Sequence, residues 1–330
     1  MSLFSGPLPA SAPSPSPLRL VGEELVRVER RLLELVSSTE PGLQQIATNL
    51  IEAGGKRLRP ALVLLVFRAA GGQDPTDAID VSAALELIHS ATLLHDDIID
   101  AGHTRRGQPS PLARHGIALT LVTGDFLFSR AFGVAGRFDE SIVGWAAEAC
   151  VSLSEGEVMQ QRFWRNPSVT IDDYLEIAAR KTAALFSQAA RIGAYLAGSP
   201  PALVEGMRSL GFEIGMGFQM VDDLLDVTGP ASVIGKPVGG DLREGTPALP
   251  TVLGLGSLPE LGAAFVAESP SAQQIASALG ALRASGVLDR VRELAAERIR
   301  AGAAKLALLP ASPYRSALAQ LVTDLLERTS

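Results

Sequence analysis

The amino-acid sequence predicts an all-α fold of roughly ten or more helices in one domain. Apolar residues recur at three- and four-residue intervals across residues 19–37, with charged residues between them, which is typical of an amphipathic helix. Further segments of helical length are rich in alanine and leucine, and none shows the convincing alternation of a strand. A hydrophobic content of 47% indicates a large buried core.

The expected helices follow one another with glycine and proline between them. Gly54-Gly55 and Gly71-Gly72 bracket one helix, and Ser199-Pro200-Pro201 separates two others. The remaining helical segments are 78–99, 115–136, 141–162, 172–197, 202–227, 270–285, 286–308 and 314–328. Residues 228–250 hold five glycines and four prolines, and they predict a long polar loop that is a candidate lid.

Composition limits the class of protein. Residues 1–17 contain five prolines and five serines, so we expect a disordered tail there and a single helical domain over 18–330. The tail lacks the pattern of a signal peptide, and no uninterrupted apolar run approaches the ~20 residues that span a bilayer. A net charge of −7 argues against a nucleic-acid partner, and Cys150 alone excludes an internal disulfide. We therefore expect a cytoplasmic protein.

Two aspartate-rich clusters carry the functional signal: Asp96-Asp97-Ile98-Ile99-Asp100 and Asp222-Asp223-Leu224-Leu225-Asp226. In each cluster the first and last aspartates are four residues apart, which places both carboxylates on one helix face, one turn apart. Three acids in five residues repel one another, and helix stability does not require them. Because Mg²⁺ prefers carboxylate oxygens and keeps positions open for phosphates, the clusters predict a cavity with metal on two walls.

Cationic groups that suit a diphosphate lie near these clusters. The segment GGKRLRP at 54–60 places Lys56, Arg57 and Arg59 just before an apolar helix, where glycines let the backbone approach a ligand. A solvated basic turn at the start of a helix would give the same pattern. Arg105 and Arg106 follow the first cluster, and they would serve either as surface ion pairs or as diphosphate ligands.

Further polar residues lie inside apolar helical segments. His89 lies seven residues before Asp96 on the same helix face; a lone histidine there is more often packed in a core, but its neighbours favour a ligand. Lys181-Thr182 lies in an alanine-rich stretch, where a phosphate would offset the cost of burying the lysine. Gln219 lies three residues before the second cluster, on the aspartate face. The implied ligand has an anionic head and an apolar tail, and the lack of a Walker loop or kinase motif argues against a nucleoside triphosphate.

From about Gly54 to Pro250 the chain resembles the trans-isoprenyl (polyprenyl) diphosphate synthase family, in its long-chain type. The motifs that carry the resemblance stand in the family's order: GGKRLRP, ELIHSATLLHDDIID, AGHTRRG, TGDFLFSRA, EGEVMQQ, ARKTAALF, GFQMVDDLLD and IGKPVGGDLREG. Any one motif is weak evidence, and the ordered set is specific. The resemblance implies a helical domain around a deep central cavity, a homodimer, and substrates that are isopentenyl diphosphate and an allylic diphosphate.

The resemblance also implies a reaction and residue roles. In the family the metal-bound allylic diphosphate ionises, isopentenyl diphosphate attacks the carbocation, and proton loss completes the new double bond. About three Mg²⁺ ions, for which Mn²⁺ substitutes, would be bound by Asp96, Asp100 and Asp222. The other acids would complete the metal site mainly through hydrogen bonds and water: Asp97, Asp223 and Asp226. Isopentenyl diphosphate would be bound by Lys56, Arg59, His89 and Arg106. The allylic diphosphate would be bound by Arg105, Lys181 and Lys236, with Thr182 and Gln219 placing partial negative charge beside the cation.

One segment departs from the family, and two other functions compete. Thr246 and Ala248 stand where the family often has lysine and threonine, so one diphosphate cation is missing or is supplied elsewhere, for example by Arg243. A terpene cyclase usually lacks the second D-D-x-x-D and the GGKRLRP segment. A non-catalytic partner subunit usually has degraded aspartate motifs. Both features are intact here, so chain elongation is the favoured function.

Product length depends on the floor of the cavity. Thr92 and Ala91 lie about one turn below the first cluster and Ile88 about one turn further, and none is aromatic. Family members with short products tend to place an aromatic residue there, so the resemblance implies a long-chain, octaprenyl-like product. A deeper floor would come from Phe126, Phe128 and Phe132. Geranylgeranyl or farnesyl diphosphate is the shorter alternative, and transient membrane contact would suit so apolar a product.

Overall fold

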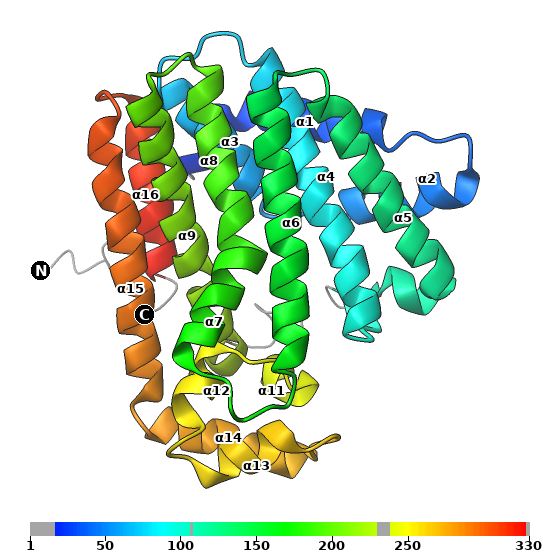
Figure 1. The fold of residues 1–330 in the computed structure, drawn as a ribbon, viewed down its shortest axis with the longest axis vertical. Coiled ribbons are helices and arrows are strands. Elements are labelled where there is room, and N and C mark those ends of the chain that lie inside the picture. The colour runs from blue at the N-terminus through cyan, green and yellow to red at the C-terminus, as the bar shows by residue number, and fades with distance from the viewer. Residues whose placement is uncertain (1–16, 106–107, 230–237, 328–330) are drawn as a thin grey trace, which may run out of the picture.

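The computed structural model describes residues 17–105, 108–229 and 238–327, and it confirms the all-α prediction (Figure 1). The first half of the chain forms η1 (Pro17–Val21), α1 (Gly22–Leu35), α2 (Pro41–Glu52), α3 (Leu58–Ala69), α4 (Thr76–Ile99), α5 (Pro111–Ala135) and α6 (Glu140–Arg162). The second half forms α7 (Ile171–Ala178), η2 (Ala179–Ala183), α8 (Ala184–Leu196), α9 (Pro201–Thr228), α11 (Gly240–Glu244), α12 (Leu249–Gly254), α13 (Pro259–Val266), α14 (Ala272–Ala284), α15 (Val287–Lys305), η3 (Leu306–Leu308) and α16 (Pro313–Glu327).

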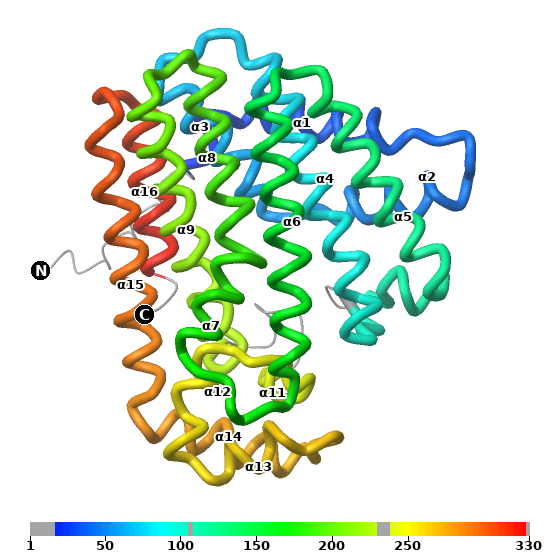
Figure 2. The backbone as a smooth tube through the Cα atoms, viewed as in Figure 1, coloured from blue at the N-terminus to red at the C-terminus, as the bar shows by residue number. Residues whose placement is uncertain are grey.

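The long helices form a bundle around α3 and α4. Figure 2 shows α6, α9 and α15 with nearly aligned axes and α4 inclined to them, while α13 and α14 lie across one end. α4 packs along α5, α9 packs against both α8 and α15, and α3 packs against α8 and α4. Every residue of α3 from Pro60 to Phe67 is buried, so this helix is apolar on all sides because neighbours enclose it. The rigid start of α3 fixes the basic segment that immediately precedes it.

Side chains set where several helices begin. The Ser110 hydroxyl accepts a hydrogen bond from the Ala113 N–H at 3.2 Å at the start of α5. At the start of α7, Thr170 and Asp173 exchange the reciprocal bonds of a capping box. Asp139 begins α6, because its carboxylate accepts from the Ser141 and Ile142 N–H groups. These polar caps hold the helices that carry the candidate site.

One predicted helix contains a π-helical turn. The expected helix over 172–197 runs as α7, then the π-helical turn η2, then α8. Gly156 of α6 packs against this turn: a Cβ built there would lie 2.7 Å from the Arg180 Cβ and 3.0 Å from the Lys181 backbone nitrogen. π-helical turns are frequent at functional sites. The turn holds Lys181 and Thr182, two of the predicted site residues.

Three expectations at the loops need correction or lie outside the described residues. A two-residue antiparallel hairpin, β1 (Thr104–Arg105) with β2 (Gln108–Pro109), follows α4, and strands this short give no periodic signal. The proposed lid over 228–250 is partly helical, since α11 and α12 begin within it, while 230–237 lie outside the described residues. The predicted tail also lies outside them, except Pro17, which begins η1.

α5 is the most apolar long helix. By length and composition alone it is able to cross a bilayer, although only 33% of its most apolar window is buried within the chain. A single helix of this kind is weak evidence for a membrane span, because helices of soluble cores meet the same criterion. α5 packs along α4 and against α2. Its remaining apolar surface therefore faces away from the core.

Candidate active site

The first aspartate cluster lies at the C-terminal end of α4. Asp96 is half-buried, Asp97 is buried and Asp100 is exposed at the position that ends the helix. Carboxylates are unfavourable at a helix C-terminus, where the helix dipole is already negative. Nearby cations, from the protein or from a ligand, must therefore stabilise this arrangement.

Lys181 supplies one of these cations. Its ammonium group forms an ion pair with Glu157 of α6 and donates to the Gln160 side chain at 3.2 Å. Burial opposes the charge, but Asp96, Glu157 and Asp100 together raise the pKa of Lys181 above its ordinary value. The side chain thus stays protonated beside the first cluster.

The second aspartate cluster divides into one exposed and two buried carboxylates. Asp222 is exposed, whereas Asp223 and Asp226 are each about 5% exposed or less. Asp226 accepts hydrogen bonds from the backbone N–H groups of Gly240 and Asp241, both at 3.2 Å, and so holds the start of α11. Asp223 accepts from the Leu249 N–H at 2.9 Å at the start of α12. The two buried acids anchor the chain that follows the cluster.

A chain of hydrogen bonds joins the π-helical turn to the second cluster. The Thr182 hydroxyl donates to the Gln219 carbonyl oxygen at 2.6 Å, and the Gln219 amide donates to Asp223 at 2.7 Å. Burial raises the pKa of Asp223 to about 6, although hydrogen bonds from Leu249 and Gln219 act to lower it. Lys181 and Thr182 are consecutive residues, so η2 lies between the clusters: the charge of Lys181 acts on the first, and Thr182 is linked to the second through Gln219.

The basic segment before α3 lines a cavity of about 420 Å³. The structure brings three residues of the predicted isopentenyl diphosphate site together here: Lys56, Arg59 and His89. Phe186 and Phe218 complete its apolar wall. A cavity lined by cations and aromatic rings suits a small ligand with an anionic head.

Arg59 is placed for a ligand. Its guanidinium lies over the Phe186 ring, 4.6 Å from the ring centroid. Its Nε is buried and makes no hydrogen bond to any residue that the structure describes. Burial lowers the pKa of Arg59 to about 10, and neighbouring Glu86 partly offsets that effect. A buried N–H without a partner is costly, so an incoming acceptor would be bound favourably.

A second cavity of about 240 Å³ lies between α4, α5, α6 and η2. Asp96 and Lys181 line its polar end, and Thr92 and Phe128 are among its less polar walls, with Ile99, Leu153 and Val158. Thr92 donates a hydrogen bond to the carbonyl of His89 at 2.8 Å, so residues one turn apart on α4 face the two cavities. This cavity combines charged and apolar lining residues.

The predicted chain-length residues occupy different places. Thr92 and Phe128 line the second cavity, and their role in chain length stays a prediction. Ala91 and Ile88 do not line it, because both are fully buried in the helical core. Phe126 instead packs against the guanidinium of Arg130, 5.0 Å from the ring centroid, and Phe132 is half-buried elsewhere on α5. Of the predicted chain-length residues, Thr92 and Phe128 therefore remain the candidates for limiting product length in this cavity.

Several predicted site residues are not placed by the structure. Arg106 and Lys236 lie outside the described residues, and Arg105 is placed only as part of β1. Thr246, which replaces the family's lysine, donates its backbone N–H to the Asp241 carbonyl. Arg243 is exposed on α11, and its role as a substitute cation stays a prediction.

Sequence reasoning missed the partners of the cations. Glu157 and Gln160 hold Lys181, and Glu86 lies beside both Arg57 and Arg59. The signal for Glu157 was available, because a lysine inside an alanine-rich helix needs a counter-charge and EGEVMQQ supplies one. Nothing in the spacing pointed to Glu86.

Known proteins are similar to this chain in sequence and in fold. The polyprenyl synthetase family model matches residues 40–280. The chain is 35% identical over 309 residues to a short chain isoprenyl diphosphate synthase from Methanothermobacter thermautotrophicus, which covers 91% of this chain and 95% of the relative. It is 32% identical over 314 residues to the octaprenyl diphosphate synthase of Escherichia coli, covering 94% and 97%.

A solved structure gives the same result. The polyprenyl synthase from Caulobacter crescentus, complexed with calcium and isoprenyl diphosphate, aligns with a TM-score of 0.91 and 34% identity, covering 95% of this chain and 97% of that one. The fold and the paired aspartate clusters thus define an all-α prenyltransferase. The chain belongs to the polyprenyl synthetase family and is a trans-prenyl diphosphate synthase.

Proposed function

We propose that this enzyme elongates an allylic diphosphate by head-to-tail (1'-4) condensation with isopentenyl diphosphate and releases a long-chain all-trans polyprenyl diphosphate. The observation that supports it is the pair of cavities on one face of α4. His89 lines the cavity with Lys56 and Arg59, and Asp96 lines the cavity with Lys181. Two anionic substrates would occupy separate cationic sites and meet along the helix.

The donor set of the aspartate clusters fits Mg²⁺. Asp96, Asp100 and Asp222 offer hard carboxylate oxygens that are half-buried or exposed. Across the described parts of the chain, no group of three His, Cys, Asp or Glu side chains is close enough to hold an ion without other ligands. Mg²⁺ usually takes one or two carboxylates and completes its coordination with water and substrate phosphates. When bound, about three such ions would stabilise the charge that develops on the leaving diphosphate.

The chain's own residues would direct the ionisation and the attack. Lys181 would bind the allylic diphosphate, while Lys56, Arg59 and His89 bind isopentenyl diphosphate. The polar side chains of Thr182 and Gln219 would lie beside the developing cation. Apolar walls would keep water from it. These interactions strengthen as charge separates, so they favour the transition state over the bound substrates.

We infer a long-chain, octaprenyl-like product from the walls of the second cavity. Thr92, about one turn before Asp96 on α4, is small, and Phe128 is the large aromatic residue in the wall. Relatives of similar identity are named for both short and octaprenyl products, so product analysis must decide between them. Geranylgeranyl diphosphate is the shorter candidate.

We also propose that the enzyme is a homodimer that pairs through α5 and α6. Large apolar side chains are exposed on both helices: Ile117, Leu119, Leu121, Val122, Val151 and Val158. An exposed apolar surface on two adjacent helices is typical of a subunit interface, and a second copy would cover it by two-fold symmetry. Light scattering should give twice the chain mass. A cytoplasmic location, with transient membrane contact during product release, completes the proposal.

The test of function is incorporation of radiolabelled isopentenyl diphosphate with an allylic starter. We expect EDTA to abolish turnover and Mg²⁺ to restore it. Asp96→Ala and Asp222→Ala should each cut turnover by several orders of magnitude while circular dichroism stays unchanged. Asp289→Ala, which removes an exposed acid from α15, is the matched control. A metal-free enzyme with full activity would refute the mechanism, and chromatography of dephosphorylated products reads the chain length.

A further inference from the structure

Arg57 lies in the sequence between two predicted diphosphate ligands, Lys56 and Arg59, but its guanidinium is held by other groups of the protein. Its backbone is left-handed, with φ 45° and ψ 39°, at the N-cap position immediately before α3. A non-glycine residue in this region is strained and persists only where its surroundings hold it. Lys56 is exposed at the cavity, whereas the Arg57 side chain is only 10% exposed. The strained turn therefore separates the directions of neighbouring cations.

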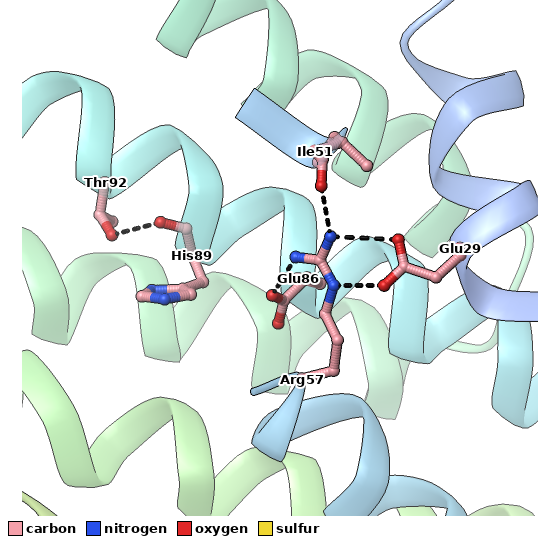
Figure 3. A network of polar contacts seen from close by, with 6 residues as sticks. All are labelled: Glu29, Ile51, Arg57, Glu86, His89 and Thr92. Atoms are coloured by element: carbon pink, nitrogen blue, oxygen red, sulfur yellow. Dashed lines mark hydrogen bonds and ion pairs between the residues drawn. The ribbon is translucent and has the colours of Figure 1, made fainter. Parts of the chain in front are cut away.

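The Arg57 guanidinium joins three helices (Figure 3). It donates to both carboxylate oxygens of Glu29 on α1, at 2.5 and 3.1 Å, and to the Ile51 carbonyl at the end of α2, at 2.8 Å. It also donates to Glu86 on α4 at 2.8 Å. Figure 3 shows the guanidinium between the Glu29 and Glu86 carboxylates. Such a charge-assisted, two-sided arrangement needs the planar fork of arginine.

Glu86 is the partner with a functional consequence. Its side chain is 6% exposed, it lines the basic cavity, and it lies three residues before His89 on α4. An uncompensated carboxylate here would repel an incoming diphosphate and would attract Arg59, because Glu86 already offsets part of the lowering of the Arg59 pKa by burial. Arg59 would then be held by the protein instead of by substrate.

We propose that Arg57 is a positioning residue for the isopentenyl diphosphate site. By neutralising Glu86, it leaves Arg59 available for the substrate and removes a repulsive charge from the cavity wall. This inference rests on the proposed function, because it assumes that the cavity of Lys56, Arg59 and His89 binds isopentenyl diphosphate. Arg57 also lines this cavity, but its guanidinium is held by Glu29, Ile51 and Glu86, so its effect on the substrate would come through Glu86.

The test separates the KM for isopentenyl diphosphate from kcat and from the KM for the allylic starter. Arg57→Ala should raise the KM for isopentenyl diphosphate by about tenfold, as expected for the loss of one charged contact. It should leave kcat and the KM for the allylic starter nearly unchanged. The double variant Arg57→Ala/Glu86→Gln should restore the KM for isopentenyl diphosphate to within about threefold of wild type, because the repulsive charge is gone. Arg57→Lys, which keeps the charge but loses the planar fork, should give a KM for isopentenyl diphosphate between those of Arg57→Ala and wild type.

A matched control removes a similar contact away from the cavity. Arg31 of α1 pairs with Asp80 of α4 at 2.7 Å, and Asp80 keeps Arg137 as a second partner at 2.9 Å. Arg31→Ala should not change either KM.

The remaining outcomes would contradict either the positioning role of Arg57 or the proposed function. If the double variant has the same raised KM for isopentenyl diphosphate as Arg57→Ala, Arg57 acts only on the fold. The same conclusion follows if Arg57→Ala impairs kcat and both KM values equally. Should circular dichroism show that Arg57→Ala is unfolded, Arg57→Gln with and without Glu86→Gln gives the same comparison. No incorporation by the wild-type enzyme would instead reject the proposed function.

Discussion

Gly156→Ala in α6 should destabilise the protein, although alanine is the better helix former. The new Cβ would lie 2.7 Å from the Arg180 Cβ, 2.9 Å from the Lys181 Cγ and 3.0 Å from the Lys181 backbone nitrogen. The nitrogen belongs to the backbone of η2, so the contact is not relieved by rotating a side chain. Overpacking of this kind costs about 1–3 kcal/mol.

Gly144→Ala is the matched control because it lies in the same helix. A Cβ there meets nothing within 4 Å. Both substitutions gain about 1 kcal/mol in helix propensity, so this gain cancels between them. The free energy of unfolding of Gly156→Ala should therefore lie about 1–3 kcal/mol below that of Gly144→Ala, which itself should exceed wild type.

Denaturant unfolding followed by circular dichroism measures the difference from the shift in midpoint. The same variants should differ in activity, because Gly156→Ala pushes on the turn that carries Lys181 and Thr182. We expect Gly156→Ala to raise the KM for the allylic substrate. Gly144→Ala should leave that KM unchanged. Equal stability of the two variants would refute the idea that close contact between α6 and η2 requires glycine.

Three other predictions follow from local contacts. Asp139→Ala removes the α6 cap and the acceptor of the Tyr195 hydroxyl, and should cost about 1 kcal/mol at pH 7. The hydrogen bond from Tyr195 holds the pKa of Asp139 below its ordinary value. The stability difference from wild type is therefore fully present above that ordinary value, and it should shrink in unfolding curves as the pH falls through the lowered pKa. Burial raises the pKa of Cys150 to about 11, so a thiol reagent at about pH 8 should react far faster with urea-unfolded than with native enzyme. Thr92→Phe should shorten the product on chromatography by filling the second cavity, and an unchanged product would place the floor elsewhere.

The sequence predicted the long helices because each carries a sustained apolar pattern between clear breakers. α4, α6 and α9 begin and end close to their predicted bounds. The π-helical turn was not predicted, since ARKTA has the composition of an ordinary helix and the turn depends on packing against α6. The β1–β2 hairpin has strands too short for any periodic signal.

At the site, local motifs were easier to predict than their distant partners. The D-D-x-x-D spacing placed Asp96 and Asp222 correctly at the ends of helices. The roles assigned to these residues stay predictions. Glu86 and Glu29 were missed because each is nearly thirty residues from Arg57, and only packing of α1, α2 and α4 brings them together. Contacts of that range follow from tertiary structure and leave no mark in local spacing.

The geometry of α4 explains how two sites stay in register. His89, Thr92 and Asp96 follow one another along one helix, so their spacing is set by its rise of about 1.5 Å per residue. From His89 to Asp96 the axis advances by roughly 10 Å, which is comparable to the size of a five-carbon unit with its diphosphate. Almost every residue of α4 up to Ala91 is buried, and so the helix cannot shift without disturbing the core. The separation between the two candidate diphosphate sites is therefore fixed by the packed interior, while the segments around α11 and α12 remain tied to Asp223 and Asp226 at the opposite wall.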